Sequence, residues 1–406
     1  MVLYSKNIIL EHDTFDGFLK IQDGKIEGLY KDYEGPYEDF SDEIVFPGFI
    51  DIHVHGWATG SFWFQKTRES VKEMCRTLPF GGVTSFLATS GADTIGEIKK
   101  CIGAADDAWE ELEEGEIEKR GEKGAELLGV HLEGPFINPQ YRGMQKEECC
   151  IEPDLEVMKD LYGSFRHRQL CRHMTIAVER GHAREVLNFC REQGIQTAIG
   201  HSGATFQEIA SIRDAGVGGV THMFSGMRGF HHREPGVVGA ALYFDDLMCE
   251  FAKQTGMTVS HEAFDIAYRL KGSERIILST DCSGLARTQS QFDHYVRKIR
   301  FVKDGDLVRL DHYDGRQEWI DPGDYEAVKE LEMSYGKSVK NMAEHTRVTW
   351  HDIMRMTSLN PARYIHVNDR KGSIKPGMDA DLTIMDQELN LVSTFCRGWE
   401  IRDYCQ

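Results

Sequence analysis

The sequence predicts an α/β protein in which a (β/α)8 barrel is inserted in a small β-sandwich formed by the N- and C-terminal segments. Three observations predict this fold. Apolar runs alternate with amphipathic stretches between about residues 50 and 280, these runs number eight, and both ends of the chain have strand character. The chain of 406 residues also exceeds the roughly 250 that one barrel needs, which leaves room for a second unit.

The terminal segments are expected to form the smaller unit. Residues 18–22 and 25–29 flank Asp23-Gly24, a pair typical of a tight β-hairpin turn. The apolar run 44–51 leads into His53, and residues 372–386 return to strand character near the C-terminus. We therefore expect a small β-sandwich domain from residues 1–46 and 373–406, and a barrel domain from residues 47–372.

The barrel is predicted from a repeated order of strand and helix. The strand that leads into His53 is the first, and helical patterns lie between most of the later strands, for example at 185–193, 206–215 and 261–270. This order favours parallel strands that close into a barrel over a sandwich. The other seven expected strands are residues 83–89, 127–132, 174–178, 197–200, 219–222, 248–252 and 276–280.

Three further segments interrupt or follow this pattern. Residues 105–126 are highly charged, and we expect a solvated helix and loop there. The segment from about 285 to 345 is polar, and its parts at 287–294 and 304–318 are expected to be excursions over the barrel mouth. A helix is expected at 350–357.

Composition excludes several classes of function. The net charge of −19 argues against a nucleic-acid partner, because phosphate neutralisation needs clustered Lys and Arg. No basic start precedes an apolar segment, and no apolar run reaches the roughly 18 residues of a membrane span. The ten cysteines are scattered, with Cys149-Cys150 the only close pair. We expect a cytoplasmic protein with buried, reduced thiols and no membrane contact.

Histidines and acidic residues mark the ends of the expected strands, where barrel enzymes place their catalytic groups. His53 and His55 are two residues apart on one strand, so both imidazoles can point into the barrel mouth. Incidental histidines on a half-buried strand would give the same pattern. Glu133 follows His131 at the end of the third strand, where a solvated turn would be the simpler interpretation.

Two further histidines and one aspartate strengthen the pattern. His201 and His222 end successive strands, and Asp281 ends the last strand. A single histidine of this kind is more often a core residue than a ligand, but the repetition favours a metal site. Imidazoles and a carboxylate without cysteine suit Zn²⁺ or Fe²⁺ with an open coordination position. Asp281 could take a proton from water and return it to a leaving amine, or it could cap a helix.

Six motifs resemble the N-acetylglucosamine-6-phosphate deacetylase family of the amidohydrolase superfamily. The resemblance implies that Glu133, His201 and His222 hold the main metal ion and that Asp281 is the general base and then the general acid. His53 and His55 would add a second ion, giving one or two ions per subunit of a homodimer. The motifs are PGFIDIHVHG at 47–56, HLEGPFINP at 131–139, GHSGAT at 200–205, THMF at 221–224, REPG at 233–236 and SLNPA at 358–362.

The resemblance also shows where the substrate contacts depart from the family. Gln145 stands where the family has a histidine, Ser225 and Gly226 replace Asn-Ala, and Thr258 falls where another histidine is usual. Arg233, which reaches the substrate phosphate across the dimer in the family, is retained. The expected reaction is removal of the acetyl group from N-acetylglucosamine-6-phosphate. The alternatives are a deacylase for another amino sugar or an N-acyl amino acid, and a non-catalytic binding protein.

Overall fold

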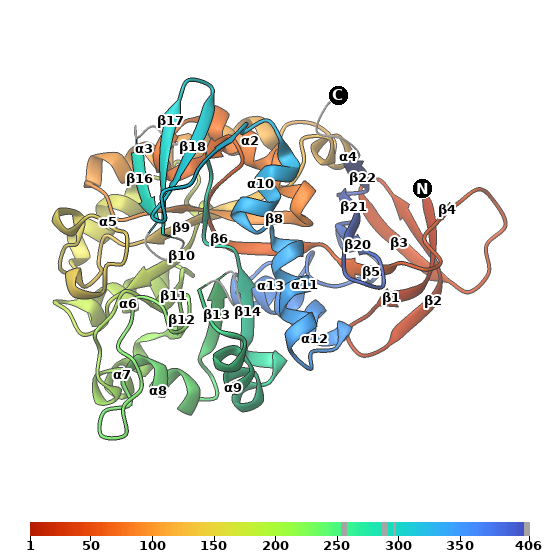
Figure 1. Cartoon of the computed structure of the whole chain (residues 1–406). Helices are drawn as coiled ribbons and strands as arrows, with labels where there is room; N and C mark the ends of the chain where they lie inside the picture. Colours follow the sequence, from red (N-terminus) through yellow and green to blue (C-terminus); the bar gives the residue numbers. More distant parts are fainter. Residues whose placement is uncertain (253–257, 286–290, 295–297, 402–406) are drawn as a thin grey trace.

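The computed structural model describes residues 1–252, 258–285, 291–294 and 298–401. A barrel with outer helices occupies one side of the molecule, and a mixed sheet made by both ends of the chain lies on the other (Figure 1). The predicted fold class is therefore confirmed. Residues 287–290 of the predicted segment 287–294 and residues 402–406 of the predicted domain 373–406, with one of the ten cysteines, lie outside the described residues.

The long strands of the barrel form one parallel sheet and follow one another in chain order. The short strand β15 (Cys282–Ser283) comes directly after the last long strand and pairs in parallel with the first, so the sheet closes on itself. Each predicted strand is present within a few residues of its expected bounds. The long strands are β6 (Phe49–Trp57), β8 (Val83–Ser90), β9 (Glu126–Glu133), β10 (Cys171–Ile176), β11 (Gln196–Ile199), β12 (Val217–Val220), β13 (Met248–Ala252) and β14 (Ile276–Ser279).

Outer helices cover the barrel because their apolar residues recur at helical spacing. In α6 (Ala183–Glu192), Val186, Leu187 and Cys190 are buried while the charged residues face outward. The predicted helices at 206–215 and 261–270 are present as α7 (Phe206–Ile212) and α9 (His261–Lys271). Both begin at a hydroxyl side chain that accepts a hydrogen bond from the first turn, as helix starts commonly do.

The charged segment 105–126 is less solvated than we predicted. Its first part belongs to α3 (Ile95–Leu112), in which Ala105, Ala108 and Leu112 form one buried face. Asp106 is buried too, because its carboxylate accepts hydrogen bonds from the backbone N–H groups of residues 166 and 167. The prediction overlooked apolar residues at helical spacing because most of the residues between them are charged.

The mixed sheet joins the two ends of the chain. Its strand order is β22-β21-β20-β5-β1-β2-β3, and β5 (Ile44–Pro47) pairs antiparallel with β20 (Leu382–Met385). Asp23 and Gly24 have φ of 50° and 72° in the turn between β2 (Thr14–Gln22) and β3 (Lys25–Tyr30), which confirms the predicted hairpin. Within 372–386 only β20 is a strand. The remaining strands are β1 (Val2–Ile9), β4 (Glu38–Asp39), which pairs with β1 beside the main order, β21 (Leu391–Cys396) and β22 (Trp399–Ile401).

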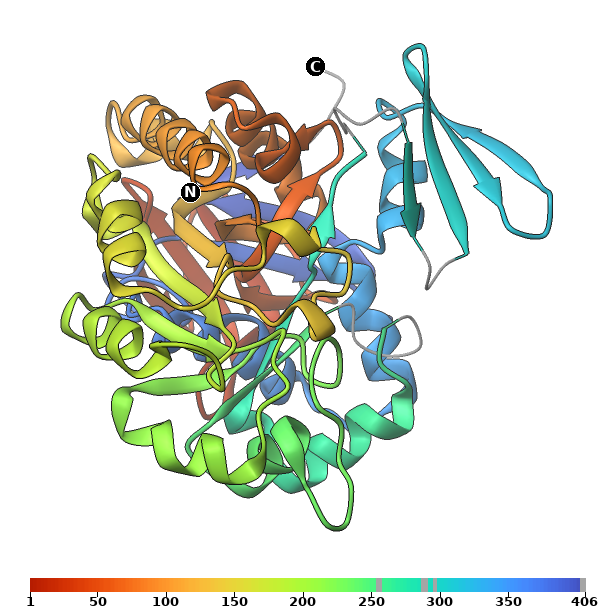
Figure 2. The same ribbon diagram turned by 90° about the vertical axis from the view of Figure 1, so that its left-hand side faces the viewer.

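The polar segment after the barrel forms an ordered sheet of its own. Antiparallel strands β16 (Gln291–His294), β17 (Ile299–Asp304), β18 (Leu307–His312) and β19 (Gln317–Ile320) follow one another in this sheet. Figure 2 shows the sheet projecting from the barrel, with α10 (Tyr325–Glu332) beside it. The expected helix at 350–357 is present as α12 (Trp350–Met354), which continues into a π-helical turn.

The nine cysteines of the described residues form no disulfide bonds, and all except the partly exposed Cys150 are buried. This agrees with the expected reduced thiols. Burial raises the pKa of several of these thiols, for example Cys75 to about 12, which makes them unreactive. No helix in the described ranges is both long and apolar enough to cross a bilayer.

A buried cluster of charges joins the barrel to the mixed sheet. Lys371 contacts Glu126 at 2.7 Å, Asp379 at 3.1 Å and also Asp381, while Arg370 contacts Glu126 and Asp379. Glu126 begins barrel strand β9, whereas the two aspartates precede β20 of the mixed sheet. Burial would raise the pKa of Glu126, but the nearby cations Lys371 and Arg370 hold it below its ordinary value of 4.5. Asp379 is likewise held below 3.8.

We expect the folded state to lose stability in acid because of this cluster. A carboxylate with a depressed folded pKa contributes stability that is full above its unfolded pKa and lost as the pH falls through its folded pKa. The contribution of Glu126 and Asp379 should be complete above about pH 5 and decline progressively below about pH 4. Thermal unfolding midpoints between pH 3 and pH 7 would measure this. A midpoint that stays constant down to pH 3 would contradict the assignment.

Candidate active site

All six predicted metal-binding and catalytic residues meet at the carboxyl ends of the barrel strands. Two groups of ligand atoms form, each with its atoms within 4.8 Å of one another. One group comprises His53, His55 and Asp281, and the other Glu133, His201 and His222. They come from β6, the end of β9, the turns after β11 and β12, and the junction of β14 and β15.

Glu133 contacts the histidines of both groups. Its Oε1 is 3.0 Å from Nε2 of His201 and 3.0 Å from Nε2 of His222. The same carboxylate is 3.4 Å from Nε2 of His53 through Oε1 and 3.3 Å from Nε2 of His55 through Oε2. The side chain is buried. A carboxylate in this position can serve two cations at once.

The tautomer of each histidine follows from the partner of its Nδ1. Nδ1 of His55 lies 3.0 Å from the carbonyl oxygen of Thr89, and Nδ1 of His201 lies 2.8 Å from that of Tyr141. Nδ1 of His222 lies 3.1 Å from the carbonyl oxygen of residue 225. A carbonyl oxygen only accepts hydrogen bonds, so each Nδ1 carries the proton and each Nε2 presents a lone pair.

The convergence of these lone pairs favours a bound cation. Nε2 of His201 and Nε2 of His222 are only 3.1 Å apart, and both face the negative carboxylate of Glu133. Nε2 of His53 is buried and has no hydrogen-bond partner among the described residues. Converging lone pairs and carboxylates repel one another in a buried site unless a positive charge lies between them. The donor set of imidazoles and carboxylates suits a divalent ion such as zinc.

Electrostatics around the site agree with this interpretation. Burial would lower the pKa of His53, but the negative charges of Glu250, Glu133 and Asp281 raise it well above its ordinary value. Burial would raise the pKa of Asp281, but the neighbouring His53 and His55 hold it at about 2. The His53 imidazole thus sits in a field that favours positive charge, which a bound cation can supply in place of a proton.

The backbone at the site has an unusual conformation. His201, His222 and Asp281 have φ of 47°, 34° and 50°, in the left-handed region that side chains other than glycine rarely adopt. All three follow the end of a barrel strand. Such conformations cost about 1–3 kcal/mol each and persist where the surroundings fix them, commonly at functional sites.

Asp281 does not cap a helix, which was the alternative interpretation. It precedes the strand Cys282–Ser283, and its backbone N–H donates to the carbonyl oxygen of His53. The buried carboxylate of Asp51 accepts hydrogen bonds from the backbone N–H and the hydroxyl of Thr280, at 3.3 Å and 2.6 Å. Asp51 therefore ties the first and last barrel strands together directly beneath Asp281. The Asp281 side chain remains 35% exposed.

A cavity of about 370 Å³ opens above the two groups. Four of the five residues predicted to bind substrate line it: Gln145, Ser225, Gly226 and Thr258. The amide of Gln145 donates to Oε2 of Glu133 at 2.6 Å and accepts from the backbone N–H of Ala92 at 2.8 Å. Its side chain is therefore fixed at the cavity floor.

Arg233 is placed differently from the other four. It is exposed, does not line the cavity, and lies in a turn where its Nε contacts Nε2 of His232 at 3.1 Å. Within the described part of the single chain, Arg233 therefore has no contact with the site.

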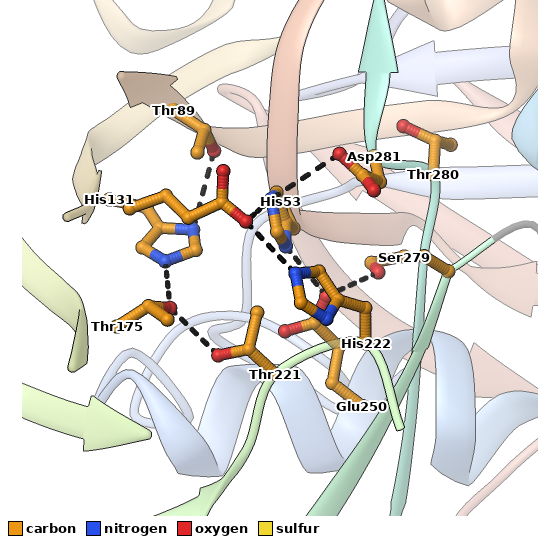
Figure 3. A network of polar contacts seen from close by, with 12 residues as sticks. His53, Thr89, His131, Thr175, Thr221, His222, Glu250, Ser279, Thr280 and Asp281 are labelled. Carbon is orange, nitrogen blue, oxygen red and sulfur yellow. Dashed lines mark hydrogen bonds and ion pairs between the residues drawn. The ribbon is translucent and has the colours of Figure 1, made fainter. Parts of the chain in front are cut away.

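Several residues of the site were missed at the sequence level. Trp63 and Glu332 also line the cavity, and the Trp63 ring packs on His55 with the ring centroids 4.9 Å apart. Beneath the site lie buried polar residues of the strands, including Glu250 and His131 (Figure 3). A single charged residue within an apolar strand, as in MCEFA at 248–252, is a signal that could have identified Glu250.

Comparisons with known proteins agree with this geometry. A model of the amidohydrolase family matches residues 44–400. N-acetylglucosamine-6-phosphate deacetylase of Bacillus subtilis strain 168 is 32% identical, over 96% of this chain and 94% of its own length. N-acetylgalactosamine-6-phosphate deacetylase of Escherichia coli O157:H7 is 28% identical, over 98% of both chains. The solved N-acetylglucosamine-6-phosphate deacetylase of Thermotoga maritima is 26% identical, covers 99% of each chain and has a TM-score of 0.78.

Proposed function

Since this chain belongs to the amidohydrolase family, and within it to the N-acetylglucosamine-6-phosphate deacetylases, we propose that it removes the acetyl group from N-acetylglucosamine-6-phosphate. The observation that carries the proposal is the convergence of four imidazole nitrogens and two carboxylates below one cavity. Water would add to the acyl carbon, the C–N bond would break, and acetate and the amino sugar phosphate would leave.

Glu133, His201 and His222 would hold one divalent ion, and His53, His55 and Asp281 would hold a second. Such ions lower the pKa of water and polarise an acyl oxygen when they are bound. Zinc fits the donor set best, and Fe²⁺ is the alternative. Metal analysis of the protein purified without chelator would identify the ion and its stoichiometry.

The chain's own groups would handle the proton. The Asp281 carboxylate is ionised near neutral pH because its pKa is about 2, and part of its side chain faces the cavity. It would accept a proton from the attacking water and return that proton to the departing amine. Gln145 lies at the cavity floor, where its amide N–H can orient the substrate acyl group.

N-acetylgalactosamine-6-phosphate is the second candidate substrate. The support is the E. coli relative, which covers nearly the whole chain at similar identity. The two sugars differ at one hydroxyl, and a site that hydrogen-bonds a hydroxyl can distinguish such substrates strongly. Gln145, Ser225, Gly226 and Thr258, where this chain departs from its family, are the residues we expect to make that choice, or to select another N-acyl amine.

Amine release from the purified, metal-analysed protein tests the proposal. The substrates are N-acetylglucosamine-6-phosphate, N-acetylgalactosamine-6-phosphate and unphosphorylated N-acetylglucosamine. Preferred turnover of the first supports the proposal, and preferred turnover of the second transfers it to the other epimer. A metal-loaded protein that is inactive on all three would refute it and leave another N-acyl substrate.

Arg233→Ala should raise KM for the phosphorylated sugar about 10- to 100-fold with little change in kcat. We propose that Arg233 of one subunit of a homodimer contacts the substrate phosphate in the other, and a hydrogen bond to a charged group contributes about 1.5–3 kcal/mol. Steady-state kinetics would measure the change, with the exposed Arg316→Ala as the matched control. An equal rise in KM for the unphosphorylated sugar would rule out the phosphate contact.

A further inference from the structure

His53 differs from the other three histidines of the site in the partner of its Nδ1. That atom lies 2.8 Å from Oε1 of Glu250, whereas the other three Nδ1 atoms face backbone carbonyl oxygens. Figure 3 shows Glu250 reaching from below toward His53, on the side away from Asp281. A carboxylate only accepts from an N–H group, so His53 also carries its proton on Nδ1.

The position of Glu250 is fixed from several sides. The residue is 3% exposed, and the hydroxyl of Ser279 donates to the same Oε1 at 2.7 Å. Its backbone carbonyl accepts from the N–H of Met223, beside His222. Burying a carboxylate is costly unless it is paired and hydrogen-bonded. Glu250 therefore has no low-energy alternative to the contact with His53.

Because Nδ1 of His53 is occupied by Glu250, only Nε2 remains available, and it faces the two groups of candidate metal ligands. Nε2 lies 3.5 Å from Asp281 and 3.4 Å from Glu133, and is buried without a hydrogen-bond partner in the described part of the chain. A carboxylate behind a ligating histidine fixes the ring and makes the facing nitrogen a stronger donor. This is the arrangement a second cation needs.

The charge of the site points the same way. Three carboxylates, those of Glu133, Asp281 and Glu250, contact the imidazole of His53. With neutral imidazoles, a single divalent ion would leave one of these negative charges uncompensated in a region of low dielectric. A second divalent ion offsets that negative charge and leaves a net positive charge.

We infer that Glu250 is a positioning residue that creates the second cation site, at His53, His55 and Asp281. This inference rests on the part of the proposed function that assigns two ions. Glu250 does not touch substrate or cation, and acts only through the orientation and basicity of His53.

Glu250→Gln tests the inference, because glutamine keeps the size and an acceptor oxygen while removing the charge. Zn²⁺ bound per chain would be measured at fixed free Zn²⁺ concentrations in the intact protein. The unchanged protein should bind two ions. In the variant the first ion should bind as before, and the second about 10- to 100-fold more weakly. Asp106→Asn, at a buried carboxylate of the outer helix α3 that bonds the backbone N–H groups of residues 166 and 167, is the matched control and should retain both ions.

A merely structural role would give a different result. Loss of packing would lower the unfolding midpoint of the metal-free protein and weaken both ions together. We expect the metal-free variant to have nearly the same unfolding midpoint as the metal-free wild-type protein. Of the stabilisation that zinc provides, only the part due to the second ion should be lost. Glu250→Gln added to His53→Asn should weaken the second ion little beyond the effect of His53→Asn alone, because Glu250 acts through that imidazole.

Two results would overturn the inference. One is wild-type affinity for both ions in Glu250→Gln, and the other is a wild-type protein that takes up a single ion at saturating zinc. If Glu250→Gln does not fold, Glu250→Asp is the second variant, because aspartate keeps the charge but places it one methylene farther from His53. Wild-type affinity of Glu250→Asp for both ions would also refute the inference. These readouts need no substrate, so a deacetylase that works with one ion would refute the inference and leave the proposed function intact.

Discussion

Replacing Asp281 with asparagine should lower kcat for deacetylation by about 10²- to 10⁴-fold, the range that general acid–base catalysis contributes. Asparagine has nearly the same shape but cannot accept the proton of the attacking water or deliver it to the amine. The ion held by Glu133, His201 and His222 should remain, since none of these contacts involves Asp281. Acetate release and metal content, measured on the same preparation, would test both statements.

The control for this variant is Asp293→Asn, in the projecting sheet, where the aspartate pairs with Arg300 at 2.7 Å. It changes the net charge equally but lies outside the site, so kcat should stay within about twofold of the wild-type value. A kcat for Asp281→Asn within tenfold of wild type would remove Asp281 from the proton-transfer role. Complete loss of zinc would show instead that Asp281 is needed to hold both ions.

The places of the proposed ligands in the fold could be predicted because of a local rule. Barrel enzymes carry their functional groups at the carboxyl ends of the strands, and His53, His55, Glu133, His201 and His222 all lie there. An apolar run followed by a histidine or an acid therefore predicts both the strand and the site. The prediction needs only the local sequence of each strand.

Residues that support the site from below could not be predicted in this way. The role of Glu250 depends on its contact with His53, which is 197 positions away in the chain. Asp51 likewise contacts Thr280 across the junction of the first and last strands. These partners are set by barrel closure and strand register, which the local sequence does not specify. The buried face of α3 is a different case, because its apolar period was present and was masked by charge.

The barrel interior below the candidate metal-binding residues is polar, whereas the interiors of such barrels usually contain branched apolar side chains. Nε2 of His131 contacts the hydroxyl of Thr175 at 2.8 Å, and that hydroxyl contacts the hydroxyl of Thr221 at 2.7 Å (Figure 3). Burial lowers the pKa of His131 well below its ordinary value and that of His173 to about 4. Both imidazoles are therefore neutral at physiological pH. The interior supplies hydrogen bonds without adding positive charge that would compete with bound cations.

Lys371→Met should lower the free energy of unfolding by about 3–5 kcal/mol, the usual cost of removing one partner from a buried ion pair. Lys371 is almost fully buried and contacts Glu126, Asp379 and Asp381. Methionine fills much of the same volume but leaves these carboxylates short of one positive charge. Denaturant-induced unfolding of both proteins in the same metal-loaded state would measure the difference.

The pH dependence of this loss separates electrostatics from packing. Without Lys371 the carboxylates should protonate at higher pH than in the wild-type protein, and a protonated acid no longer needs a buried cation. The deficit of Lys371→Met should therefore shrink as the pH falls below about 5, whereas a packing defect would be independent of pH. The exposed Lys100→Met, whose lysine pairs with Glu97 on the surface of α3, should cost no more than about 0.5 kcal/mol. A deficit for Lys371→Met as small as this control would mean that the barrel and the mixed sheet are held together by apolar contacts rather than by the charge cluster.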